Sequence, residues 1–446
     1  MTAHNLSFAL PPMAQIGEQY LVILAAVALL FPCSILSYIV VTPYWRLSRV
    51  LTGDWHIDIV KLHEKYGNLV RISPNEVALN TPSAVQTIYG HTGQPWVKGE
   101  WYQAWWQPAM NHPFFAETNP AIHRDLRRRV SKAYSMSYIL QMEHFIDPLV
   151  DDIRSKLTAL SGQSVDMSQW TQYFAFDAVG ELAFGKAFGF IENQCDFNGL
   201  LESVYVYMTS TASFGFMPSK LILENGNLFG GLIPFEKIVR EKLTLSGEPD
   251  RSDLLRHFQS AKNADGTPMS PQDVFGESMN VVGAGADTTA ISVRAILRYV
   301  CSNPRVLQKL QAEINNASAT GALSDLPNFA EGNALPYFQA VIKEALRVFP
   351  AVGYQLPRVV PSGGTEIEGK FLPANATVSV NGWALHRNKS IFGEDADEFR
   401  PERWLEGYTK LMESCYASFG FGSRTCIGKN MALMEINKVE PPSLLL

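Results

Sequence analysis

A short glycine-rich run near the C-terminus constrains this chain more than any other feature. It is Phe419-Gly420-Phe421-Gly422-Ser423-Arg424-Thr425-Cys426-Ile427-Gly428. Glycine permits tight turns and a close approach of the backbone to a flat ligand, and turned backbone N–H groups can point at a sulfur atom and stabilise its thiolate. A helix-like run, 429–435, follows at once, and a helix N-terminus also favours an anion. The pattern predicts a thiolate at Cys426 and, at Arg424, a cation able to pair with a carboxylate.

A second run, Ala284-Gly285-Ala286-Asp287-Thr288-Thr289, lies inside a long helical pattern. Gly283 and Gly285 each cost about 1 kcal/mol relative to alanine in a helix interior, and a threonine hydroxyl can bond back to a carbonyl and bend the helix. We expect a local opening of the helix here, with room for a diatomic ligand beside a flat cofactor. Asp287 and Thr288 would place an acid and an alcohol next to that opening, as proton delivery to dioxygen requires.

Together the two runs resemble the cytochrome P-450 family of haem-thiolate monooxygenases. The first matches the family's haem-binding loop, F-G-x-G-x-R-x-C-x-G, and the second matches its oxygen-activation helix. The whole order of segments, from YG-x-x-V-R-I-S-P-N-E to the cysteine loop, is similar to the fungal membrane-bound branch and covers residues 45–438. The resemblance implies a mainly helical fold with small segregated β-sheets, in which haem lies between the oxygen-activation helix and the cysteine loop.

The same resemblance implies a cofactor and a reaction. Cys426 would be the axial ligand of haem b (iron protoporphyrin IX), because a thiolate pushes electron density onto iron and favours O–O cleavage. Thr288 would donate a hydrogen bond to bound dioxygen, and Asp287 would relay protons. The enzyme would insert one oxygen atom of O2 into an apolar small molecule, with electrons from NADPH through NADPH-cytochrome P-450 reductase, and cytochrome b5 could be a second donor.

The implied setting is fungal secondary metabolism, with mycotoxin biosynthesis first and detoxification of plant aromatics second. Two other functions stay open. One is an electron-independent haem-thiolate isomerase or dehydratase, which would have little use for the pair Asp287 and Thr288. The other is a non-catalytic, truncated haem-binding membrane protein.

Several charged residues fit roles that the resemblance implies. Haem carries two propionates, which need cationic or donor partners. His123 and Arg127 lie four residues apart and share a helix face. Together with Arg358 and Arg424 they are the predicted propionate partners, although the family often has tryptophan at the position of His123. The remaining predicted haem-binding residues are those of the cysteine loop: Phe419, Gly420, Gly422 and Gly428.

Two further charged groups are predicted from the same likeness. Glu344 and Arg347 lie three apart on a helix and can form an ion pair; with Arg403 they resemble the family's buried Glu–Arg–Arg network, which has a structural role. Arg128, Arg129, Lys132 and Lys429 form either a solvated basic surface or a contact for an acidic electron-donor protein.

Hydrophobic periodicity and turn residues predict the elements that carry these motifs. Helices are expected at 58–66, 171–184 and 271–300, strands at 68–73 and 76–79, and a second β-rich stretch at 354–380.

Substrate contacts are the least defined part of the site. Aromatic residues crowd one short stretch and favour either an apolar pocket or ordinary core packing. They are Trp96, Trp101, Tyr102, Trp105 and Trp106. Val352 and Gly353, which follow the Glu344 helix, are expected to face the pocket.

Composition narrows the remaining choices. The chain has 446 residues and no linker-like segment, so one large haem-binding domain, 45–446, is expected. A net charge of −6 argues against nucleic acid as a partner. Five cysteines without a CxxC pair favour neither disulfides nor a zinc site.

Both ends of the chain suggest further features. After a short tail, 1–19, residues Tyr20–Val41 carry no charge, and about 20 apolar residues span a bilayer. Arg46 and Arg49 follow this segment, so the positive-inside rule places the large domain in the cytosol and the anchor in the endoplasmic reticulum membrane; a buried core helix is the alternative. At the other end, the resemblance stops near Lys438, and we expect the family's last C-terminal strands to be missing and activity to be limited.

Overall fold

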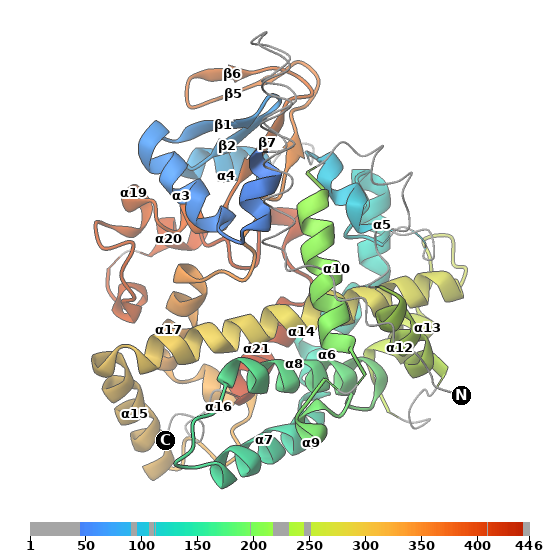
Figure 1. Cartoon of the computed structure of the whole chain (residues 1–446), viewed down its shortest axis with the longest axis vertical. Helices are drawn as coiled ribbons and strands as arrows, with labels where there is room; N and C mark the ends of the chain where they lie inside the picture. Colours follow the sequence, from blue (N-terminus) through green and yellow to red (C-terminus); the bar gives the residue numbers. More distant parts are fainter. Residues whose placement is uncertain are drawn as a thin grey trace, which may run out of the picture.

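The computed structural model describes residues 45–90, 96–106, 111, 113–196, 198–216, 232–244, 251–407 and 409–439. Helices make up most of this part of the chain, and two small β-sheets lie at one end of the molecule, beside helices from the N-terminal part of the described chain (Figure 1). The predicted fold class, mainly α with small segregated sheets, is confirmed.

The α-helices are α3 (Trp55–Tyr66), α4 (Pro82–Tyr89), α5 (Pro120–Val130), α6 (Met136–Ile139), α7 (Asp147–Ala159), α8 (Met167–Phe184), α9 (Phe190–Asn193), α10 (Leu200–Phe214), α12 (Leu232–Thr244), α13 (Leu254–Ser260), α14 (Pro271–Cys301), α15 (Pro304–Ala319), α16 (Phe329–Asn333), α17 (Pro336–Val348), α18 (Gly382–Leu385), α19 (Lys389–Phe392), α20 (Lys410–Ser414) and α21 (Lys429–Val439). Short 3-10 helices are η1 (Glu100–Trp105), η2 (Ser131–Tyr134), η3 (Glu143–Phe145), η4 (Pro401–Trp404) and η5 (Gly422–Arg424).

The strands are β1 (Leu69–Ser73), β2 (Glu76–Leu79), β3 (Val97–Lys98), β4 (Arg358–Val359), β5 (Thr365–Ile367), β6 (Lys370–Leu372) and β7 (Thr377–Val380). Five of them form a sheet in the order β1-β2-β7-β4-β3, and β5 and β6 form a separate hairpin. The β2–β7 pair is parallel and the other pairs are antiparallel. The predicted β-rich stretch 354–380 therefore supplies strands to both sheets.

The central helix α14 shows how local sequence sets an element. Pro271 occupies its first turn, and Ser270 and Asp273 form a capping box, each side chain accepting a hydrogen bond from the backbone N–H of the other. The helix then runs unbroken to Cys301. The predicted helix 58–66 begins earlier than expected, at Trp55, because this buried tryptophan packs into the core as part of the helix.

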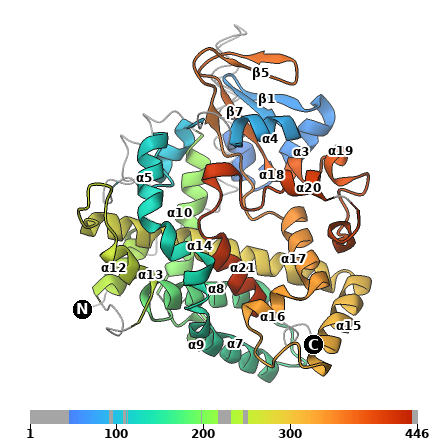
Figure 2. The ribbon, with the colours of Figure 1, turned by 180° about the vertical axis from the view of Figure 1, so that it is seen from behind.

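The molecule is organised around α14. Figure 1 shows it crossing the middle of the helical part beside α8 and α17, and Figure 2 shows α21 against it from behind. Apolar side chains of these helices belong to the largest core cluster. Each of the four helices contributes several of them, for example Phe174, Val282, Val341 and Met434. Burial of such side chains contributes about 25 cal/mol per Å².

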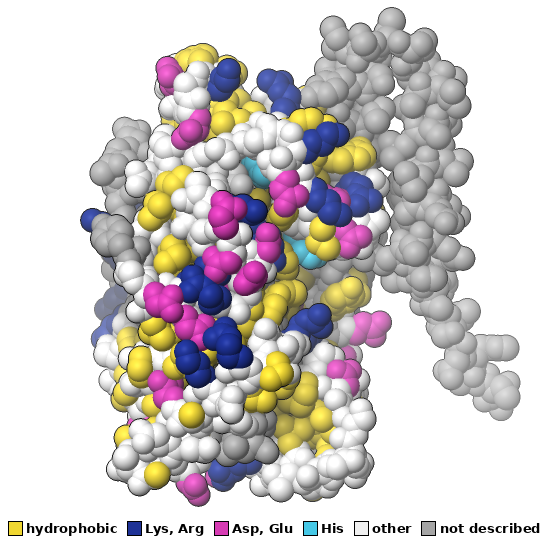
Figure 3. Space-filling view, turned by 90° about the vertical axis from the view of Figure 1, so that its left-hand side faces the viewer, with side chains coloured by type: hydrophobic (Ala, Val, Ile, Leu, Met, Phe, Trp, Pro, Cys, Tyr) yellow, Lys and Arg dark blue, Asp and Glu magenta, His cyan; other side chains and the backbone are white. Residues whose placement is uncertain are grey.

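Charged side chains of both signs lie on the surface of the molecule (Figure 3). On the face shown in Figure 3, lysine and arginine side chains are interspersed with aspartate and glutamate. No helix among the described residues has both the length and the apolar character needed to cross a bilayer. The predicted anchor, 20–41, and the final residues, 440–446, lie outside the described part of the chain.

Candidate active site

The cysteine loop adopts a left-handed backbone conformation, which favours glycine, at two positions. Gly420 and Gly422 have φ of 70° and 61°, in the left-handed region that favours glycine. A Cβ at Gly422 would also lie 1.9 Å from the carbonyl oxygen of Tyr89. The loop closes on itself through the Cys426 N–H, which donates to the Phe419 carbonyl at 2.8 Å. The sequence thus fixes a tight turn that brings Cys426 to the start of α21.

The sulfur of Cys426 has a mixed electrostatic environment. Burial of the loop raises the pKa of the thiol, whereas the backbone N–H groups of Gly428 and Lys429 and the charge of Arg127 act in the opposite direction. The side chain is nevertheless exposed rather than packed against other residues. An exposed sulfur set among inward-pointing donors can coordinate a metal, because those donors stabilise its thiolate.

The face of α14 that carries the oxygen-activation motif is open. Ala284 is the one exposed residue between Val274 and Leu297, while Asp287 and Thr288 are half-buried. The Thr288 hydroxyl donates to the Ala284 carbonyl at 2.8 Å. The local helix opening that we expected is absent from α14. The room on this face comes instead from the small side chain of Ala284, because the helical bonds are kept and the hydroxyl bonds back to the turn before it.

Asp287 and Gly285 differ in what surrounds them. Burial raises the pKa of Asp287, and the positive charge of Arg294, two turns further along α14, opposes this. A Cβ at Gly285 would lie 3.2 Å from Met431 of α21 and 3.2 Å from Val179 of α8. Since Met431 follows Cys426 by five residues, the helix of the oxygen-activation motif rests directly on the helix of the cysteine loop.

A cluster of cationic side chains lies beside the loop. Lys98, His123 and Arg358 are buried, with 4%, 4% and 3% of their surface exposed. Arg127 donates to the Thr425 carbonyl at 2.7 Å, and Arg358 donates to the Tyr102 hydroxyl at 3.0 Å. The structure therefore brings together all four predicted propionate partners, His123, Arg127, Arg358 and Arg424, which electrostatically perturb one another.

The pKa values of this cluster indicate excess positive charge. Burial, together with the charges of the neighbouring cations, lowers the pKa of Lys98 to about 6 and that of His123 to about 2. All three guanidinium nitrogens of Arg424 are buried and lack a hydrogen-bond partner among the described residues. An uncompensated buried cation is costly, and the negative charge of Glu117 opposes the positive charges at both Lys98 and Arg424 only in part. The residues fit the two carboxylates of haem, which would supply the missing negative charge.

Lys98 is a member of this cluster that sequence reasoning missed. It lies in strand β3, its ammonium group donates to the carbonyls of Phe114 and Phe115 at 3.0 and 2.6 Å, and it lies 4.7 Å from the centre of the Tyr102 ring. In the sequence, Lys98 stands out only as a lysine within a tryptophan-rich stretch. That pattern does not indicate that its side chain lies beside charged residues of other helices and strands.

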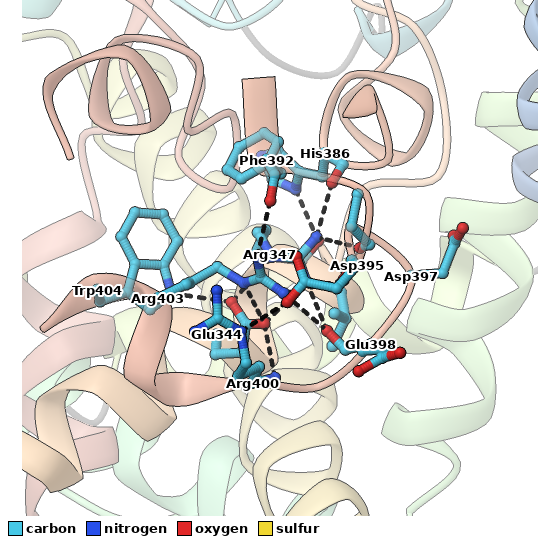
Figure 4. A network of polar contacts seen from close by, with 12 residues as sticks. Glu344, Arg347, His386, Phe392, Asp395, Asp397, Glu398, Arg400, Arg403 and Trp404 are labelled. Carbon is cyan, nitrogen blue, oxygen red and sulfur yellow. Dashed lines mark hydrogen bonds and ion pairs between the residues drawn. The ribbon is translucent and has the colours of Figure 1, made fainter. Parts of the chain in front are cut away.

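The predicted structural network is present as one buried assembly. Glu344, Arg347 and Arg403 are 0%, 0% and 2% exposed. One oxygen of Glu344 accepts from both arginines at 2.8 Å, and its other oxygen accepts from Arg347 at 2.8 Å and from Trp404 at 2.9 Å. The remaining arginine N–H groups donate to carbonyls of the segment 386–398 (Figure 4).

His386 links this network to the start of the cysteine loop. Its Nε2 accepts from the Ala417 N–H at 2.7 Å, so Nδ1 carries the proton and donates to the Arg347 carbonyl at 2.7 Å. Burial and the charge of Arg347 lower the pKa of His386 to about 3, which keeps the ring neutral. The neutral imidazole thereby fixes the distance between helix α17 and the segment that enters the loop.

The structure corrects one expectation from the sequence and bears on two others. Arg129 is not part of an exposed basic surface, because its 5% exposed side chain forms ion pairs with Asp273 and Glu277 of α14. That Val352 and Gly353 face the pocket stays a prediction: Val352 is 42% exposed, and a Cβ built on Gly353 would lie 3.4 Å from the Cβ of His56. For the aromatic stretch, the structure favours core packing over an apolar pocket at Trp101 and Tyr102, which are buried in a small core cluster.

Known proteins are similar to this chain over almost the whole described part. The sequence model of the cytochrome P-450 family matches residues 45–439. A cytochrome P-450 monooxygenase of Aspergillus terreus is 35% identical over 426 residues, which cover 90% of this chain and 86% of the relative. A pisatin demethylase of Fusarium vanettenii is 34% identical over 418 residues, or 89% and 79% of the two chains.

A third relative gives the same result. The cytochrome P-450 monooxygenase gsfF of Penicillium aethiopicum is 35% identical over 431 residues, with 90% of this chain and 84% of the relative covered. The glycine-rich cysteine loop, the motif of α14 and these similarities agree, and the chain belongs to the cytochrome P-450 family as a haem-thiolate monooxygenase.

Proposed function

We propose that this monooxygenase inserts one atom of O2 into an apolar small molecule of fungal secondary metabolism. The observation that carries the proposal is the meeting of α14 with the cysteine loop, where the open face around Ala284 and the exposed Cys426 lie beside a buried cationic cluster. The fungal relatives support the setting: the gsfF protein is a named monooxygenase, and the Fusarium protein is named for the demethylation of pisatin.

Each residue has a role that its contacts support. Haem, when bound, supplies the redox chemistry for the activation of dioxygen. Cys426 would ligate the iron, and Arg127, Arg358, Arg424, Lys98 and His123 would hold the propionates. Thr288 and Asp287 would handle protons: the hydroxyl that now donates to the Ala284 carbonyl can turn toward the reacting oxygen, and the raised pKa of Asp287 makes this carboxyl a better proton source.

The proposed electron donor is NADPH-cytochrome P-450 reductase, with cytochrome b5 as a second candidate. Arg128 has a side chain that is 65% exposed on α5, and Lys132 and Lys429 are also exposed. Arg128 and Lys132 lie at and beyond the end of α5, and Lys429 directly follows the cysteine loop. These cations would attract an acidic partner toward the thiolate side of the site.

The proposed location is the endoplasmic reticulum membrane, with the haem domain in the cytosol. Its support is the uncharged run Tyr20–Val41 and the arginines that follow it, Arg46 and Arg49. Protease added to intact microsomes should digest the haem domain, and full protection of the domain would reverse this topology.

An absorption spectrum of the reduced, carbon monoxide-bound protein tests whether the chain binds haem through a thiolate ligand. The parent chain should show the long-wavelength Soret band of a thiolate ligand, and Cys426→Ser should abolish it. With NADPH, reductase and isotopically labelled dioxygen, one labelled oxygen atom should enter the product. Product formation without NADPH would instead indicate an isomerase or dehydratase, and a normal spectrum without turnover on any apolar substrate would indicate a non-catalytic haem protein.

A further inference from the structure

The open face of α14 extends beyond the oxygen-activation motif. Residues at positions 280, 284, 287, 288 and 291 are exposed or half-buried, and their spacing places all of them on one side of the helix. The other sides are packed against α8, α17 and α21. A substrate that reaches Thr288 must therefore lie along this strip, where Ala284 and Ile291 offer only apolar surface.

Asn280 is the one amide on this strip. It lies one turn before Ala284, and its Nδ2 donates to Oε2 of Glu277 at 3.4 Å. Among the described residues, its Oδ1 has no protein partner. The amide thus presents an acceptor at the edge of the open face, next to the position from which a substrate would be oxidised.

Glu277 determines which end of that amide points outward. It is 1% exposed and lies 3.6 Å from the guanidinium of Arg129, which also binds Asp273 at 3.1 Å. An ionised carboxylate accepts hydrogen bonds but donates none, so it holds the NH2 group of Asn280 and leaves the oxygen free. Burial raises the pKa of Glu277 to about 7, and the charge of Arg129 opposes this shift. Above neutral pH the carboxylate form predominates.

We propose that Asn280 is a substrate anchor, whose Oδ1 accepts a hydrogen bond from a hydroxyl group of an otherwise apolar substrate lying over Ala284. This inference rests on the proposed function and adds the substrate class, a compound with a phenolic or alcoholic O–H. An acceptor that is covered by a substrate without a donor is left unpaired, so the site discriminates against the corresponding methyl ether.

The test uses the haem-loaded protein and two probes that differ by one methyl group, naphthol and its methyl ether. Binding of each is followed by the shift of the Soret band near pH 8, at which Glu277 is largely ionised and faces Arg129, Asp273 and Tyr134. The parent should bind naphthol about tenfold more tightly than the ether. Asn280→Leu should bind the two probes equally.

Two further variants separate the anchor from a general effect on the fold. Glu277→Gln should reduce the preference without abolishing it, because a glutamine amide can also donate to Oδ1 and turn the asparagine round. Ser278→Ala removes a hydroxyl that bonds the Val274 carbonyl at 2.8 Å on a buried side of α14, and it should keep the parent's preference. Each variant is first checked for the thiolate band after reduction with carbon monoxide.

The outcomes distinguish this inference from the proposed function. Equal binding of the two probes by the parent, no binding of either, or a retained preference in Asn280→Leu would overturn the anchor while leaving the monooxygenase assignment intact. A parent chain that takes up no haem would instead contradict the function on which the inference rests.

Discussion

Gly285 of α14 packs against Met431 of α21, since a Cβ at Gly285 would lie 3.2 Å from the Met431 Cε. Alanine there gains about 1 kcal/mol in helix propensity, which offsets the cost of moving the flexible Met431 and the Val179 side chain, each 3.2 Å from that Cβ, by a few tenths of an ångström. We expect Gly285→Val to be different, because two more carbons would force α14 away from α21 and cost about 1–3 kcal/mol.

The measurement is the thermal unfolding of the haem-loaded protein together with its haem content. Gly285→Ala should match the parent, Gly285→Val should lose haem more readily, and adding Met431→Ala to the valine variant should restore part of the loss. A valine variant that retains haem as well as the parent would show that this contact does not set the spacing of the helices.

Removal of the Thr288 hydroxyl should uncouple electron use from product formation. Positioned proton transfer contributes typically about 10²–10⁴-fold, so Thr288→Ala should keep haem and consume NADPH while it forms peroxide in place of product. Ser292→Ala is the matched control, because it removes a hydroxyl that bonds the Thr288 carbonyl at 2.8 Å one turn further along α14. Equal product per NADPH in parent and Thr288→Ala would rule out this role.

The cationic cluster predicts opposite effects on the protein with and without haem. Arg424 has no hydrogen-bond partner among the described residues and lies among other cations, which, with burial, lower its pKa to about 10. Arg424→Met should therefore raise the unfolding temperature of the haem-free chain and weaken haem retention in the loaded protein. Arg128→Met, on the exposed side of α5, should change neither property; a haem-free Arg424→Met chain that is less stable than the parent would contradict the charge argument.

The network around Glu344 should be essential for stability. Arg403→Ala leaves the fully buried carboxylate of Glu344 with one partner fewer. Loss of one partner of a buried ion pair lowers the free energy of unfolding by about 3–5 kcal/mol. Lys389→Ala breaks an ion pair whose side chains are 56% and 90% exposed and should cost less than about 1 kcal/mol. Urea unfolding of both variants gives the comparison, and similar losses would show that the network contributes no more than a surface pair.

Glu435 predicts a pH-dependent stability. It is fully buried in α21 near Thr289, and burial raises its pKa from 4.5 to about 8. A carboxyl whose folded pKa is raised contributes stability that is fully present below pH 4.5 and is lost as pH rises through about 8. Relative to the parent, Glu435→Gln should therefore gain unfolding temperature steadily from about pH 5 to about pH 9. A constant difference between the two proteins over this range would mean that Glu435 does not titrate there.

Contiguous runs of sequence determined much of this protein. The left-handed glycines at 420 and 422, the capped start of α14 at Ser270 and the three-residue spacing of Glu344 and Arg347 follow from local backbone and helix geometry. Local geometry depends on a few neighbouring residues, so the cysteine loop, the oxygen-activation motif and the mainly helical class could be predicted without a structure.

Tertiary packing alone decided which side chains share an environment. Arg129 looked like its exposed neighbour Arg128, but α14 approaches it and pairs it with Glu277, which in turn orients Asn280. Lys98 joins the cationic cluster only because β3 pairs with the strand of Arg358. Arg129 and Glu277, like Lys98 and Arg358, are separated by more than a hundred residues along the chain. The charges and pKa values of such partners depend on burial that no local pattern of residues specifies.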